Sequence, residues 1–177
     1  MRAVLFHFDD PSQHAPALAL LRRMPELQGA PIRIHRSHNL RDRRGPVHAG
    51  CFLRERRIAF DCTRAEFPRI FVHEVAHFIW LRLGNPIRRS YEDLIRSERA
   101  RGELGWSAEW RKNALAPSDI KGRTRRWREY CCESFCDSVA YLYSGLKRHP
   151  EFTLAGNVRR RRAQWFQQVL DGGPLSI

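Results

Sequence analysis

A run of mostly apolar residues, FVHEVAHFIW at positions 71–80, constrains this chain more than any other stretch, because it places two histidines and a glutamate among hydrophobic neighbours. Pro68 precedes the run and the sequence GNP follows Leu83, which are typical start and stop signals of a helix. We therefore expect a buried helix from Pro68 to about Leu83. Imidazole and carboxylate groups are costly to bury without a partner, and a metal ion is such a partner.

The spacing of the three polar residues fits a metal site. In a helix, His73 and His77 lie one turn apart on the same face, so both imidazoles can reach one ion. Zinc held by three protein ligands lowers the pKa of its fourth ligand, a water, to about 7. Glu74 stands beside the first histidine, where its carboxylate can take a proton from that water. The sequence therefore predicts Zn²⁺ bound by His73 and His77, with Glu74 as general base, which is the HExxH pattern of metallopeptidases.

A third histidine ligand is not supplied by the same helix. The longer pattern HExxHxxGxxH is absent, because position 80 is Trp and position 83 is Leu. His149 is the remaining downstream histidine, and it lies in a predicted loop. The third ligand is therefore expected from another element.

A later helix, predicted over residues 125–145, offers carboxylates instead. Glu129, Glu133 and Asp137 follow one another at intervals of four, which puts them on one helical face. Their spacing alone leaves either Glu129 or Glu133 as the ligand. Cys132 and Cys136 share this helix, and we interpret both as buried small apolar residues.

The segment ESFCD at 133–137, combined with HEVAH at 73–77, resembles the gluzincins, zinc peptidases whose third ligand is a glutamate on a later helix. Among these, the chain looks most like the catalytic domain of the anthrax lethal factor type, over roughly residues 30 to 145 and about ten specific positions. The resemblance implies that Glu133 is the third ligand and that Asp137 orients a zinc-bound histidine. It also implies an α+β, zincin-like fold with a small mixed sheet, a backing helix and a helical C-terminal half.

The residue that stabilises the oxyanion departs from this pattern. Enzymes of the lethal factor type place a tyrosine two turns before the ligand glutamate, and position 126 here is Arg. Tyr130, one turn before Glu133, is our candidate for that donor. Arg126 and Tyr141 are the alternatives.

The rest of the chain is expected to form one domain, 1–177. Residues 1–66 supply the sheet and the backing helix, 67–84 the active-site helix, and 87–177 a helical lower part. The expected elements are strands at 3–8 and 32–36, helices at 15–27 and 157–170, and a hairpin at 51–62. In the hairpin, a turn at Arg56-Arg57 would place Cys51 opposite Cys62.

The net charge of +13 and the pI near 10.7 make nucleic acid a possible partner, but not the favoured one. The arginines are scattered through the chain, and we interpret the run at 159–162 as the solvated face of the last helix. Five cysteines without framework spacing are typical of a reducing compartment, so we expect a cytoplasmic protein. No stretch of eighteen apolar residues is present, so no membrane span is expected.

These features together predict a zinc metalloendopeptidase whose protein or peptide substrate lies extended along a free sheet edge. One alternative is a zincin-like regulatory protein, as in the ImmA/IrrE group, that acts on a dedicated protein partner. A second alternative is a basic nucleic-acid-binding protein with structural zinc, although a structural site needs no general base at Glu74.

Overall fold

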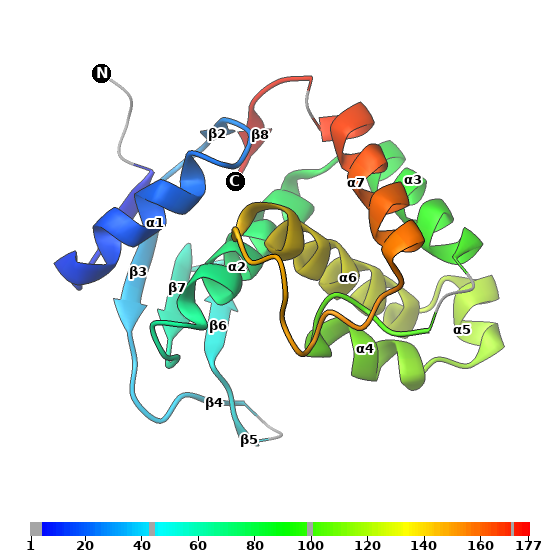
Figure 1. Ribbon diagram of the computed structural model, residues 1–177, viewed down its shortest axis with the longest axis horizontal. Coiled ribbons are helices and arrows are strands. Elements are labelled where there is room, and N and C mark those ends of the chain that lie inside the picture. Colours follow the sequence, from blue (N-terminus) through cyan, green and yellow to red (C-terminus); the bar gives the residue numbers. More distant parts are fainter. Residues whose placement is uncertain (1–4, 43–44, 99–100, 171) are drawn as a thin grey trace.

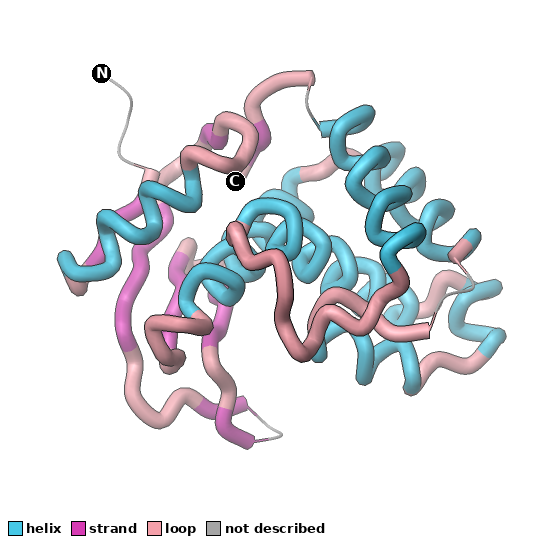
Figure 2. The backbone as a smooth tube through the Cα atoms, in the orientation of Figure 1, coloured by secondary structure: helices cyan, strands magenta, loops and turns pink. Residues whose placement is uncertain are grey.

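The structure is a computed structural model that describes residues 5–42, 45–98, 101–170 and 172–177. It is a mixed α/β structure, which confirms the predicted α+β class. Strands gather on one side and most helices on the other, with helix α2 (Phe67–Arg82) between them (Figures 1 and 2).

The main sheet has four strands in the order β1-β3-β7-β6. Strands β1 (Phe6–Phe8), β3 (Ile32–Arg36) and β7 (Arg57–Phe60) run parallel, and β6 (Ala49–Phe52) is antiparallel to β7. The alternation in β3 explains its place, because Ile32 and Ile34 are fully buried whereas Arg33 is exposed. Strand β6 is an edge strand that contacts α2. Short strand pairs join β2 (Leu27–Gln28) to β8 (Leu175–Ser176) and β4 (Arg41–Asp42) to β5 (Gly45–Pro46).

The predicted hairpin is present, but its predicted register is wrong. Cys51 lies opposite Ile58 rather than Cys62, and the turn is formed by residues 53–56. Arg56 supplies the left-handed backbone conformation of this turn, with φ at 49°. The partner of Cys51 moves by four residues, an even number, and residues four apart in a strand lie on the same face, so the corrected register still pairs Cys51 with a residue of that face.

The backing helix is shorter than predicted. A 3-10 turn, Pro11–Gln13, leads into α1 (His14–Leu21), which ends well before residue 27. Pro25 disfavours a helical conformation at the residue before it, and the chain then enters β2. The first part of the predicted strand 3–8 lies outside the described residues; the remainder is β1.

The helical side is built from α3 (Asn85–Ser97), α4 (Trp106–Asn113), α5 (Pro117–Gly122), α6 (Arg125–Tyr143) and α7 (Gly156–Leu170). Helices α2 and α6 pack extensively against each other, which brings the two motif segments together (Figure 1). An aromatic cluster centred on Tyr91 and Phe135, with Trp80 and Trp165, fills the space behind them.

Arg162 corrects our interpretation of residues 159–162 as a solvated face. Its side chain is only 1% exposed and forms ion pairs at 2.7 Å with both Glu98 and Glu103. Arg162 also donates to the hydroxyl of Ser138 on α6. A helical period places one residue of any four-residue run toward the core, and here that residue is a cation that the two carboxylates neutralise.

Candidate metal centre

Helices α2 and α6 bring three potential ligands together. His73 and His77 lie on α2 with ring centroids 5.0 Å apart, and Glu133 approaches from α6. Glu133 Oε2 is 3.3 Å from His73 Nε2 and 3.9 Å from His77 Nε2. Donors that each lie 2.0–2.2 Å from one tetrahedral ion are about 3.4 Å apart. The two distances from Glu133 Oε2 are thus close to the spacing of donors around one ion.

Asp137 determines which nitrogen of His73 is free. Its Oδ1 lies 2.8 Å from His73 Nδ1, and its carboxylate is almost completely buried. The proton of a neutral His73 is thereby held on Nδ1, which leaves the lone pair of Nε2 directed to the same side as Glu133. The other carboxylate oxygen of Asp137 accepts a 3.1 Å hydrogen bond from the backbone N–H of Ala108 in α4.

This contact between α4 and Asp137 depends on Gly105, the residue before α4. A Cβ at position 105 would lie 2.3 Å from the Asp137 carboxylate carbon and oxygen. The N-terminus of α4 can therefore approach Asp137 because residue 105 has no side chain. The partial positive charge of a helix N-terminus favours the ionised form of such a carboxylate.

Arg111 holds the remaining oxygen of Glu133. Its guanidinium, which also stacks on Trp110, lies 3.1 Å from Glu133 Oε1. Burial opposes ionisation of Glu133, but the hydrogen bond from Nε2 of a protonated His73 and the charges of His77, His73 and Arg111 outweigh it and lower the pKa to about 2. The sequence alone does not single out Arg111, because nothing in a chain with this many arginines marks one of them as the partner of Glu133.

Glu74 is buried next to the histidines and makes no hydrogen bond within the described part of the chain. Burial raises the pKa of its carboxyl above the ordinary value, and the charges of His77 and His73 offset only part of this shift. A buried carboxyl without a protein partner is normally satisfied by water or by an ion.

Two cysteines line the opposite edge of the His77 ring. Cys136 Sγ and Cys132 Sγ lie 3.4 and 3.6 Å from His77 Nδ1. His73, His77 and Cys136 form a group whose ligand atoms all lie within 4.8 Å of one another; His73 and Cys136 are buried and His77 is partly buried, and this group could hold a metal ion. The geometry thus offers Glu133 on the Nε2 side of His77 and the thiols on the Nδ1 side.

The other candidates from the sequence lie elsewhere. Glu129 is half-exposed and pairs with Arg125 at 2.7 Å, and His149 contacts Glu66 at 3.2 Å. Tyr130 is buried and donates its hydroxyl proton to Glu103, within the cluster that contains Arg162. Its hydroxyl is thus already used in a structural network, so its position gives no support to the expected oxyanion role. Of the alternatives, Arg126 is exposed, and Tyr141 packs edge-on against Phe152.

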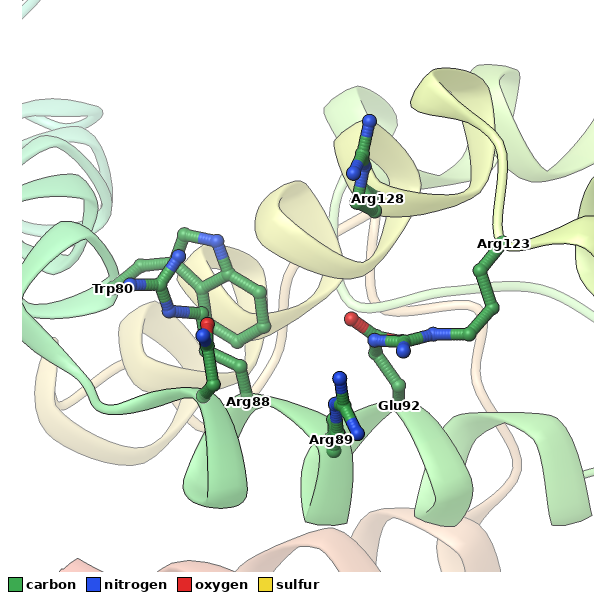
Figure 3. A pocket seen from close by; sticks show the side chains of 7 residues that line it. Trp80, Arg88, Arg89, Glu92, Arg123 and Arg128 are labelled. Atoms are coloured by element: carbon green, nitrogen blue, oxygen red, sulfur yellow. The ribbon is translucent and has the colours of Figure 1, made fainter.

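A separate basic pocket of about 300 Å³ opens between α2, α3 and α6 (Figure 3). Its walls are formed by Trp80, Asn85, Arg88, Arg89, Glu92, Arg123 and Arg128. Arg123 pairs with the buried Glu92 at 2.6 Å, whereas Arg89 and Arg128 have no acidic partner among the residues that the structure describes. The field in this pocket therefore favours an anion.

In the described part of the chain, no helix has the length and apolar character that crossing a bilayer demands. Comparisons of this chain with protein-family models, with curated proteins and with solved structures find no match.

Proposed function

We propose that this chain is a zincin-like zinc metallopeptidase of the gluzincin type. The observation that carries the proposal is the approach of Glu133 Oε2 on α6 to Nε2 of both His73 and His77 on α2. Glu74 is buried beside them and has no hydrogen-bond partner among the described residues. Asp137 supports the same assignment, since metal-bound histidines usually donate their other N–H to a carboxylate.

Glu133 is a better third ligand than Cys136 for an ion on this side of the histidines. Asp137 occupies His73 Nδ1, so His73 can bind only through Nε2. The Nε2 atom of His77 faces Glu133, whereas Cys136 lies at the Nδ1 atom of the same ring. A ligand set that uses Nε2 of both histidines is therefore completed by the carboxylate.

Zinc, when bound, supplies a water of lowered pKa and polarises the scissile carbonyl. Glu74 accepts a proton at its carboxylate and delivers it to the leaving amine, a role that a carboxyl of raised pKa performs well. Asp137 keeps His73 in the tautomer that can bind the metal, and Arg111 keeps one oxygen of Glu133 away from it. The remaining oxygen of Glu133 is thereby left to face the histidines.

The substrate would be an extended peptide that pairs with the free edge of β6. This strand ends the sheet and contacts α2, so a peptide added there would run past the site. Cys51 on β6 lies close enough to Glu74 and Glu133 for their charges to affect its pKa, which burial raises above the ordinary value. The edge is thus near the carboxylate that would act as base.

The test combines zinc per chain by elemental analysis with cleavage of an unstructured peptide library. Glu133→Gln should lose both zinc and cleavage, and Glu74→Gln should keep zinc and lose cleavage. Glu129→Gln is the matched control, because this exposed glutamate on the same helix should keep both. Cleavage by the zinc-loaded protein that survives Glu74→Gln would refute the proposed mechanism.

The basic pocket favours a second candidate, a regulatory protein that binds an anionic partner such as nucleic acid. Arg89 on α3 and Arg128 on α6 line the pocket (Figure 3), and neither has an acidic partner in the part of the chain that the structure describes. Salt-dependent DNA binding that survives Glu74→Gln and weakens in Arg89→Ala/Arg128→Ala would support this candidate. DNA binding unchanged by the double substitution would exclude the pocket as its cause.

A further inference from the structure

The thiols of Cys132 and Cys136 have no part in the proposed hydrolysis, although they contact a proposed ligand. They lie at 3.6 and 3.4 Å from His77 Nδ1. An imidazole nitrogen 2.0–2.1 Å and a thiolate sulfur 2.3 Å from one tetrahedral ion are about 3.5 Å apart. Both nitrogen–sulfur distances match that value without any rearrangement.

We propose that Cys132 Sγ, Cys136 Sγ and His77 Nδ1 form a second metal site, selective for thiophilic ions such as Cu⁺ and Cd²⁺. Thiolate ligands favour soft ions, whereas the two imidazoles and one carboxylate of the first site suit zinc. Binding releases one proton from each thiol to the solvent. A divalent ion on two thiolates and a neutral imidazole then has no net charge, which suits the buried position of Cys136.

The two sites compete for His77. A histidine bound to zinc through Nε2 keeps its remaining proton on Nδ1, where a thiol sulfur can accept it. An ion at the thiols takes the place of that proton, so both sites can be filled only if His77 loses both protons. We therefore expect a thiophilic ion to displace zinc. This inference shares His77 with the proposed function but does not depend on peptide hydrolysis.

The experiment is a Cd²⁺ titration of the zinc-free protein, followed by the ultraviolet sulfur-to-cadmium charge-transfer absorbance. A saturable band near one Cd²⁺ per chain is expected in the wild type and in Glu133→Gln, and it should be lost in Cys132→Ser/Cys136→Ser. Cys62→Ser is the matched control, because this half-buried cysteine follows β7 and should leave the band unchanged. Circular dichroism and the melting temperature show that each variant is folded.

Two results would overturn the second site: no band in the wild type, or a band that persists in the folded double variant. A band that disappears in Glu133→Gln would also overturn it, because the ion bound to sulfur would then depend on Glu133 and would not occupy a separate site. The proposed peptidase function would fail separately: zinc-loaded protein would then cleave no peptide. The cadmium band would remain in that case, because it depends only on the thiols and His77.

Discussion

Replacing Gly105 by alanine tests the contact on which the orientation of His73 depends. The backbone at Gly105 has φ of −175°, an extended conformation that alanine adopts without strain. Any effect must therefore come from the added methyl group. That group would lie 2.3 Å from Asp137 Cγ, so α4 or Asp137 has to move by about 1 Å to reach an ordinary contact.

The expected cost has two parts. Overpacking of a buried contact destabilises by about 1–3 kcal/mol. A displaced Asp137 also loses its hydrogen bond to His73, and the loss of such a partner typically lowers metal affinity about 10–100-fold. We expect Gly105→Ala to show both effects, in urea unfolding and in competition of zinc with a chromophoric chelator.

Gly84→Ala is the control, since a Cβ at position 84 meets only Pro86 Cδ at 3.6 Å. The double substitution Gly105→Ala/Asp137→Ala separates overpacking from the loss of the hydrogen bond to His73. Removing the Asp137 carboxylate makes room for the methyl group at position 105. Gly105→Ala should therefore cause little further destabilisation in a protein that already carries Asp137→Ala. Wild-type stability together with wild-type zinc affinity in Gly105→Ala would refute the described approach of α4 to Asp137.

Two further substitutions probe the surroundings of the site. Arg111→Met should reduce zinc affinity about tenfold, because Glu133 loses the partner that holds its second oxygen. Competition of zinc with a chromophoric chelator measures this affinity. An unchanged affinity would show that Arg111 does not orient Glu133. Glu103→Gln should destabilise the fold by about 3 kcal/mol in urea unfolding, since it removes one of the two carboxylates that neutralise the buried Arg162. Burial alone would raise the pKa of Glu103, but the charge of Arg162 outweighs it and lowers the pKa below its ordinary value. The stabilisation from ionised Glu103 is therefore complete above about pH 4.5 and is lost as the pH falls through the lower pKa of the folded state. Glu103→Gln should lose less stability in acid than the wild type does. An unchanged dependence of stability on pH would contradict this assignment.

The sequence was most informative where structure follows from local periodicity. The predicted helix from Pro68 to about Leu83 is α2, because its start and stop signals and its apolar composition are local properties. The spacing of His73 and His77 then requires that the two imidazoles share a face. The same reasoning located α6 to within two residues, with Glu133 and Asp137 on the side that meets α2.

Long-range packing decided the rest. The hairpin register depended on a turn at Arg56 that has no Asn-Gly signal, and the pairing of β2 with β8 joins segments that lie far apart in the sequence. Position 162 lies one turn from both Val158 and Phe166, so helical spacing directs it toward the core, but only the tertiary structure shows that Glu98 and Glu103 neutralise an arginine there.

For the candidate site, the sequence by itself determined the residues on α2 and the face of α6 that could meet them, because both follow from a helical period of 3.6 residues. The tertiary structure alone decided what surrounds them: Arg111 on Glu133, Gly105 against Asp137, and two thiols on the far edge of His77. These contacts join elements whose relative positions are determined by the packing of the whole core, and no local pattern encodes them.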